Sequence, residues 1–244
     1  IFHFAGYANT GKSFVEPDLC WRDNLDGTRN LYDCVHRSGL QPRILFVSTG
    51  LIYGEPKNDT AFDESAEFRP ASPYAASKAA ADAMSYQYTK NPGLDIVRVR
   101  LFNQIGPRQS PDYAIASFAR QIALIEAGRQ THLETGDLSA RRDITDVRDI
   151  VAAFRLLMER GERGEAYNAG RGETHRIQDV LTRCVSLAKV PIEVRSKADA
   201  KRAGDTAVTR ADNRKLRSTT GWEPKIALDQ SLTDILAAWR KTAY

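Results

Sequence analysis

Short apolar runs that alternate with helix-like stretches are the feature that most constrains how this chain can fold. Residues 1–4 and 43–47 are apolar runs of strand length, and apolar side chains between them recur at helical spacing until Gly39, a natural helix stop. A helix over about residues 73–88 then precedes another apolar run at residues 96–101. Such alternation is typical of a parallel sheet with right-handed crossovers, so we predict an α/β chain.

The pattern changes after residue 105, where a loop containing proline and glycine interrupts the alternation. Further helices are expected at about residues 115–127, at 146–160, where Gly161 ends an apolar stripe, and at 228–239. We therefore expect a second, smaller lobe to begin at residue 106.

Composition narrows the class of protein. The 244 residues are 42% hydrophobic, enough to bury a full core, yet no apolar run approaches the roughly 20 residues that cross a bilayer. The first residues also lack the basic lead-in of a secretory signal. The net charge is +4, but the basic residues are interspersed with 31 Asp and Glu, which argues against a nucleic-acid partner. We expect neither a membrane nor a nucleic acid as partner.

Cysteine and histidine residues are few and scattered. The three cysteines are an odd number without metal-ligand spacing, typical of reduced thiols in a cytoplasmic protein: Cys20, Cys34 and Cys184. The histidines also stand singly: His3, His36, His132 and His175. We therefore predict no metal site.

The sharpest chemical signal lies in residues 72–80, where Tyr74 and Lys78 are four apart and share one face of the predicted helix. A free tyrosine has a pKa of about 10, and an adjacent ammonium favours the phenolate and lowers that pKa. The pair could then exchange a proton with a sugar hydroxyl. Taken alone, the motif is equally compatible with a half-buried aromatic ring and a solvated charge.

The context of that motif favours chemistry. Ser48 and Thr49 end the predicted strand at residues 43–47, and parallel sheets place their active sites at strand ends. A hydroxyl there can bind the reacting sugar oxygen and hold it against Tyr74. Without the motif, the two residues would be ordinary polar residues at a strand end.

With these motifs the chain resembles the extended short-chain dehydrogenase/reductase family over essentially its whole length. Residues 2–6 are similar to the family's fourth strand, residues 24–28 to the start of its next helix, and Thr49, Tyr74 and Lys78 to its catalytic triad. The resemblance implies a Rossmann-like doubly wound parallel sheet. Residues 1–105 would form part of a dinucleotide-binding domain, and residues 106–244 mainly a nucleotide-sugar-binding lobe with segments that return to the first domain.

The resemblance also implies roles for single residues. Thr49 would bind the substrate oxygen. Lys78 would hydrogen-bond the ribose of a nicotinamide cofactor, NAD or NADP. The residues expected beside that cofactor are Ala5, Gly6, Ser48, Tyr74 and Lys78.

Within the family, residues 102–107, 117–123 and 140–149 are most like GDP-4-keto-6-deoxy-mannose reductases and next most like GDP-mannose 4,6-dehydratases. This likeness implies that Asn103 contacts the sugar or its phosphates and that Arg142 pairs with the diphosphate. For Arg142 a structural ion pair with a nearby aspartate is an equal alternative. Arg202 and Asp205 resemble an arginine and an acid near the nucleotide, although Ala203 replaces the usual proline.

Two departures from the family pattern bear on function. Leu51 stands where dehydratases carry an acid that helps to remove water, which favours carbonyl reduction over elimination. The family's first three strands and their glycine-rich turn have no counterpart, so the residue that separates NAD from NADP is not present. We expect the chain to belong to a longer protein; the alternative is a protein that has lost tight cofactor binding.

The sequence thus predicts an NAD(P)-dependent reductase of a GDP-linked 4-keto-6-deoxy sugar in deoxysugar biosynthesis. One alternative is a nucleotide-sugar epimerase or 4,6-dehydratase that uses the same triad. Another is a non-catalytic nucleotide-binding protein on the same fold. By likeness to the family, the helices over residues 24–36 and 74–88 would form a four-helix homodimer interface, and the protein would be cytoplasmic.

Overall fold

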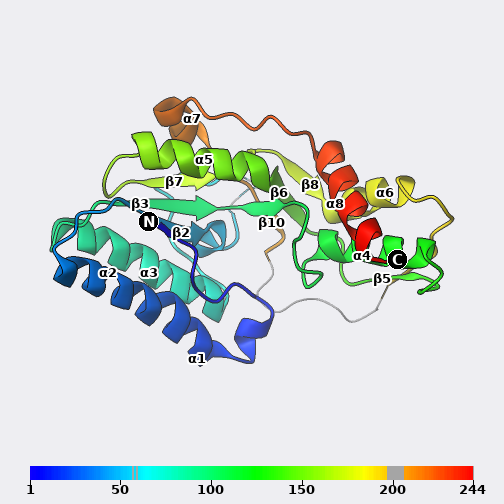
Figure 1. Ribbon diagram of the computed structural model, residues 1–244, viewed down its shortest axis with the longest axis horizontal. Coiled ribbons are helices and arrows are strands. Elements are labelled where there is room, and N and C mark those ends of the chain that lie inside the picture. The colour runs from blue at the N-terminus through cyan, green and yellow to red at the C-terminus, as the bar shows by residue number, and fades with distance from the viewer. Residues whose placement is uncertain (57, 59, 197–205, 244) are drawn as a thin grey trace.

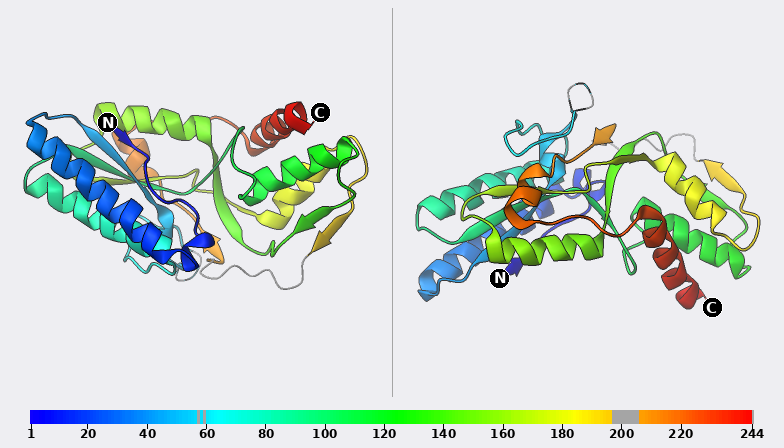
Figure 2. Two further views of the ribbon diagram at one scale, coloured as in Figure 1. Left: turned by 60° about the horizontal axis from the view of Figure 1, so that its bottom comes forward. Right: turned by 90° about the horizontal axis from the view of Figure 1, so that it is seen from above.

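The computed structural model describes residues 1–56, 58, 60–196 and 206–243, and it divides visibly into two parts that lie side by side (Figures 1 and 2). The first part is built on a sheet with helices on both faces. The second holds two small sheets and, among the described residues, the helices α4 (Ala114–Glu126), α6 (Ile177–Ser186) and α8 (Leu228–Ala243). Within the described ranges, no helix combines the length and the apolar character needed to cross a membrane.

The main sheet is parallel throughout, in the order β1-β2-β3-β7. Its strands are β1 (Phe2–His3), β2 (Ile44–Thr49), β3 (Ile96–Leu101) and β7 (Ala166–Ala169). Helices α2 (Gly27–Ser38) and α3 (Pro73–Lys90) cover one face. Helices α5 (Val147–Arg160) and α7 (Arg214–Thr220) cover the other (Figure 1). The predicted α/β architecture is confirmed.

Both faces of the sheet are apolar, which explains why its strands read as continuous apolar runs. In β2, Leu45 packs toward α5, whereas Ile44 and Phe46 pack toward α2 and α3. Successive side chains of a strand point to opposite faces, so one run of residues serves two cores.

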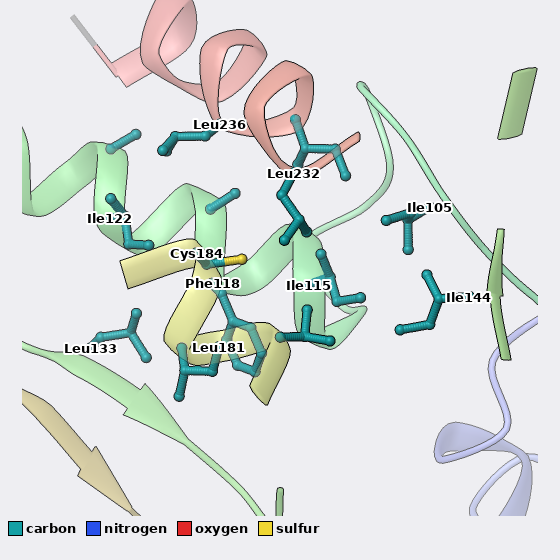
Figure 3. Close-up of a cluster of buried hydrophobic side chains, with 14 residues drawn as sticks. Ile105, Ile115, Phe118, Ile122, Leu133, Ile144, Leu181, Cys184, Leu232 and Leu236 are labelled. Atoms are coloured by element: carbon teal, nitrogen blue, oxygen red, sulfur yellow. The ribbon is translucent and has the colours of Figure 1, made fainter. Parts of the chain in front are cut away.

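The second part surrounds a separate apolar cluster, drawn in Figure 3. Helices α4, α6 and α8 pack around it. One small sheet has the order β10-β6-β4, with β8 antiparallel to β6, and β5 pairs with β9. These strands are β4 (Asn103–Ile105), β5 (Leu133–Thr135), β6 (Arg141–Asp146), β8 (Thr174–Arg176), β9 (Val194–Ser196) and β10 (Val208–Thr209).

The expected division at residue 106 remains a proposal. The chain passes from β3 to β4 through Phe102 alone. Strand β7 belongs to the main sheet and α5 packs on it, although both follow residue 106 in sequence.

Helix ends follow the local signals. The Ser72 hydroxyl accepts a hydrogen bond from the Ala75 N–H at 3.1 Å, and Pro73 occupies the first turn, so α3 begins where the sequence predicts. Gly39 ends α2 in the left-handed region, at φ 69°.

The helix before Gly39 starts earlier than the periodicity suggests. Helix α1 (Pro17–Cys20) and the π-helical turn η2 (Trp21–Asp26) run directly into α2. The remaining described helices are the 3-10 turns η1 (Lys12–Phe14) and η3 (Gly50–Tyr53).

Candidate active site

A cleft of about 500 Å³ opens where β1, β2 and β3 end and the second part begins. Because the strands are parallel, their carboxyl ends meet at this edge, the usual place for a ligand in such sheets. Its lining includes all three members of the predicted triad: Thr49, Tyr74 and Lys78.

The local structure explains how the triad converges. Tyr74 lies in the first turn of α3, and a side-chain hydrogen bond joins it to Thr49, which ends β2. The Thr49 hydroxyl also accepts from the Leu51 N–H at 3.3 Å. Lys78, one turn further along α3, donates from Nζ to the Val47 carbonyl at 2.9 Å and lies 5.3 Å from the centre of the Phe46 ring. The structure therefore brings a hydroxyl, a phenol and an ammonium to one edge of the sheet.

The electrostatics of the pair differ from the expectation that Lys78 lowers the pKa of Tyr74. Burial raises the pKa of Tyr74 to about 12, and the hydrogen bond from Thr49 opposes that rise only in part. Burial lowers the pKa of Lys78 to about 8, with the Asp82 carboxylate acting in the opposite direction. Desolvation is the largest influence on the pKa of both groups, and sequence spacing cannot reveal burial. Tyr74 therefore holds its proton at neutral pH.

The expected cofactor residues form the first-sheet side of the cleft. Gly6 has φ +150°, and a Cβ there would lie 2.4 Å from Asn24 Oδ1 and 3.7 Å from Lys78 Nζ. Ser48 lines the same cleft, and its buried hydroxyl has no hydrogen-bond partner among the described residues. Ala5 lies in an adjoining depression beside Gly6 and Arg22.

Asn24 is a candidate site residue that sequence reasoning missed. The π-helical turn buries it fully, and its Nδ2 donates to Ser77 Oγ at 3.0 Å. Its Oδ1 has no partner within the described ranges. At this place the structure brings together Gly6, which has no side chain, the unpartnered Asn24 Oδ1 and the Lys78 ammonium. These groups fit the ribose and the ring of a nicotinamide cofactor. The signal in the sequence was the asparagine that begins residues 24–28.

The expected substrate residues are not all gathered here. Asn103 lines the cleft, and the Thr209 hydroxyl lies 3.4 Å from its Oδ1. Arg142 is buried on β6, outside the described lining of the cleft, and donates to the Arg141 carbonyl at 3.0 Å. Arg202 and Asp205 lie outside the described residues.

Loops contribute further lining residues that carried no periodic signal: Tyr7, Thr10, Gln109 and Tyr113. The Tyr113 hydroxyl donates to the Ala8 carbonyl at 3.2 Å, which ties the second part to the segment after β1. Gln109 donates to the Gln104 carbonyl at 3.0 Å, and its Oε1 has no partner in the described part of the chain.

The described lining contains no Asp or Glu. Leu51, in the position of the dehydratase acid, is part of that lining. The titratable side chains of the described lining are therefore Tyr7, Tyr74, Lys78 and Tyr113.

Comparison with known proteins agrees with this geometry. A family model described as GDP-mannose 4,6 dehydratase matches residues 1–235. The chain belongs to this family. The resemblance to extended short-chain dehydrogenases/reductases and the Rossmann-like fold are confirmed.

One curated relative and two solved structures are similar to nearly the whole chain. The GDP-6-deoxy-D-mannose reductase of Pseudomonas aeruginosa is 34% identical over 241 residues, which cover 98% of this chain and 79% of the reductase. The structure of RMD from the same organism, complexed with NADPH, matches with a TM-score of 0.93 at 34% identity and covers 99% of this chain and 81% of RMD. UDP-glucose 4-epimerase of Thermus thermophilus, in complex with NAD, matches with a TM-score of 0.87 at 30% identity, over 98% and 76% of the two chains.

These matches place the protein among NAD(P)-dependent nucleotide-sugar oxidoreductases, dehydratases and epimerases, as the sequence predicts. The expectation that further strands precede residue 1 stays a prediction.

Proposed function

We propose that the protein reduces the 4-keto group of a GDP-linked 6-deoxyhexose, using NADPH or NADH. One observation carries this choice of reaction: a protonated Tyr74, hydrogen-bonded to Thr49, lies in a cleft whose described lining offers no carboxylate. The identity of 34% to a GDP-6-deoxy-D-mannose reductase supports the choice of substrate.

The triad suits the reductive direction. When bound, the reduced nicotinamide supplies the hydride to the carbonyl carbon. Tyr74 donates its phenolic proton to the carbonyl oxygen, which leaves an alcohol and a tyrosinate. Thr49 orients that oxygen by a hydrogen bond, and the Lys78 ammonium stabilises the tyrosinate that forms. With its pKa raised to about 12, Tyr74 keeps its proton at neutral pH and can give it to the more basic alkoxide oxygen that forms as hydride is added, whereas oxidation of a hydroxyl would require the phenolate as base.

Elimination of water needs a base that removes a proton from the sugar carbon, and the leucine at position 51 cannot act as one. A 4-epimerase would use the same triad and return its hydride to the same sugar. The two reactions therefore differ in net cofactor consumption.

Binding of the nucleotide sugar would fall to the second part. We assign Asn103 to the sugar or phosphates and Arg142 to the diphosphate, with Arg202 and Asp205 near the nucleotide. An arginine fork matches phosphate oxygens in pairs. We also propose a homodimer through α2 and α3, because both helices carry exposed surface beside one another; the cytoplasmic location stays a prediction.

The test is turnover of GDP-4-keto-6-deoxymannose, followed by the loss of NADPH or NADH absorbance. We expect stoichiometric cofactor oxidation, and a loss of rate of about 10²-fold or more in Tyr74→Phe. Tyr86→Phe is the matched control, because Tyr86 lies on the same helix and is exposed. Conversion of the sugar without net cofactor oxidation would indicate the epimerase.

The non-catalytic alternative is examined by calorimetric titration. Binding of GDP without binding of NADPH or NADH, together with no turnover, would favour a nucleotide-binding protein. Unchanged turnover in Tyr74→Phe would exclude the assignment of that residue as the acid.

A further inference from the structure

Three polar side chains are buried beneath the triad, on the face of the main sheet that α3 covers. Asp82 of α3 and Tyr53 of η3 are fully buried, and Arg100 of β3 is 4% exposed. A charged pair and a phenol in a protein interior are costly unless each group is paired, so their geometry calls for a reason.

Arg100 connects the other two residues. Its Nε and Nη2 donate to the two oxygens of Asp82, at 3.2 and 3.1 Å. Its Nη1 donates to the Tyr53 hydroxyl at 2.8 Å and to the Glu64 carbonyl at 2.8 Å. The guanidinium carbon also lies 4.7 Å from the centre of the Phe68 ring. All three guanidinium nitrogens of Arg100 therefore donate hydrogen bonds, which fixes the orientation of this planar group.

Tyr53 also forms a hydrogen bond to strand β7 of the main sheet. Its hydroxyl donates to Asn168 Oδ1 at 2.8 Å, and Asn168 Nδ2 donates to the Phe62 carbonyl at 2.8 Å. Phe62 in turn pairs with residue 211, close to Thr209 in the cleft lining.

The positions of these groups in the chain relate them to the triad. Asp82 lies one helical turn after Lys78, on the helix that also carries Tyr74. Tyr53 ends the turn η3, and Thr49 caps the start of that turn, where its hydroxyl accepts from the Leu51 N–H. Arg100 thus bonds the helix of the acid to the turn of the substrate-binding hydroxyl.

We propose that Asp82, Arg100 and Tyr53 form a positioning cluster that holds Thr49 at hydrogen-bond distance from Tyr74. This inference rests on the proposed function of the triad and adds residues that touch neither substrate nor cofactor. A misplacement of about 1 Å at reacting groups can lower the rate about 100-fold. The fixed geometry of the bidentate Arg100–Asp82 contact therefore matters for the rate, and not only the positive charge of Arg100.

Arg98, which lies two residues before Arg100 on β3 and outside the positioning cluster, provides a matched control. Its Nη1 donates to the Asp82 carboxylate at 2.6 Å and to the Asp82 backbone carbonyl at 3.5 Å, whereas its Nε and Nη2 donate to the Gly164 carbonyl at 3.2 and 2.8 Å. It is bonded away from the Thr49 turn. Loss of its fork should therefore weaken α3 packing and leave the triad geometry intact.

The experiment compares kcat, KM and the thermal unfolding temperature of four proteins: wild type, Arg100→Lys, Tyr53→Phe and Arg98→Lys. We expect kcat to fall about 10- to 100-fold in Arg100→Lys and Tyr53→Phe, with KM within about twofold, and to stay within about twofold in Arg98→Lys. Loss of kcat in all three variants in proportion to their fall in unfolding temperature would overturn the proposal.

A double variant separates positioning from general weakening. If Tyr53 acts through Thr49, adding Tyr53→Phe to Thr49→Ala lowers kcat no further, whereas additive losses contradict the proposal. Crystal structures of the wild type and Tyr53→Phe measure the Thr49–Tyr74 contact without any assay. If the Thr49–Tyr74 contact is the same in both crystal structures, the positioning role of the cluster is wrong, whatever the activity of the wild type. If the wild type does not turn over the keto sugar, the proposed function is wrong, whatever the contact.

Discussion

The buried ammonium of Lys78 should lower the free energy of unfolding of the protein, although the proposed reaction depends on it. Burial lowers its pKa from 10.5 to about 8, which corresponds to about 3 kcal/mol for keeping the ammonium charged inside the fold. Lys78→Met removes that cost and loses the hydrogen bond to the Val47 carbonyl, worth about 1 kcal/mol. At pH 7 we expect the variant to be inactive and about 2 kcal/mol more stable, as measured by urea denaturation.

The pH dependence gives the sign of the effect. Below about pH 8 the amine is protonated in both the folded and the unfolded state, so the full cost is present. Between about pH 8 and 10.5 the folded protein has released a proton that the unfolded chain still holds, so the wild type gains stability as pH rises. The advantage of Lys78→Met should therefore shrink across that window.

The control is Lys90→Met, which removes an exposed ammonium from the same helix. A difference between Lys78→Met and wild type that stays constant from pH 7 to pH 10 would refute the reasoning. So would a Lys90→Met curve with the same pH dependence.

Three further results are expected. The rate of keto-sugar reduction should fall as pH rises above about 8, because Lys78 loses the charge that stabilises tyrosinate, and a rate that stays flat to pH 9.5 would contradict this. Gly6→Ala should weaken NADPH binding at least about tenfold in a fluorescence titration, because its Cβ would meet Asn24 at 2.4 Å. The control is Gly39→Ala, whose Cβ would meet nothing within 4 Å. This variant should bind NADPH normally and lose only about 1 kcal/mol of stability. Wild-type protein incubated with GDP-mannose and NADP should form no product lighter by one water, measured by mass spectrometry, since the described cleft lining has no carboxylate.

The element order and the triad could be predicted because their signals are local. Ser72 and Pro73 define the start of α3, Gly39 defines the end of α2, and spacing alone puts Tyr74 and Lys78 on one helical face. Each of these depends on residues only a few positions apart.

The rest depends on burial and on contacts between distant residues. The four-residue spacing predicts that Lys78 lowers the pKa of Tyr74, but it cannot show that Tyr74 is buried. Because burial raises that pKa, the predicted direction of the shift is wrong. The roles of Arg98 and Arg100 could not be predicted from the sequence, because their partner Asp82 comes from a different element. Asn24 escaped notice because the π-helical turn that turns it inward has no periodic signature.

The order in which the strands leave the ribosome has a consequence for folding. Strand β3 ends at Leu101, but its neighbour β7 begins only at Ala166, after β4, α4, β5 and β6 of the second part have been synthesised. Until then one edge of β3 has no strand beside it, and pairing over such separations is slow. Newly made chains should therefore depend on chaperones until Ala169 emerges, although the finished sheet is buried on both faces.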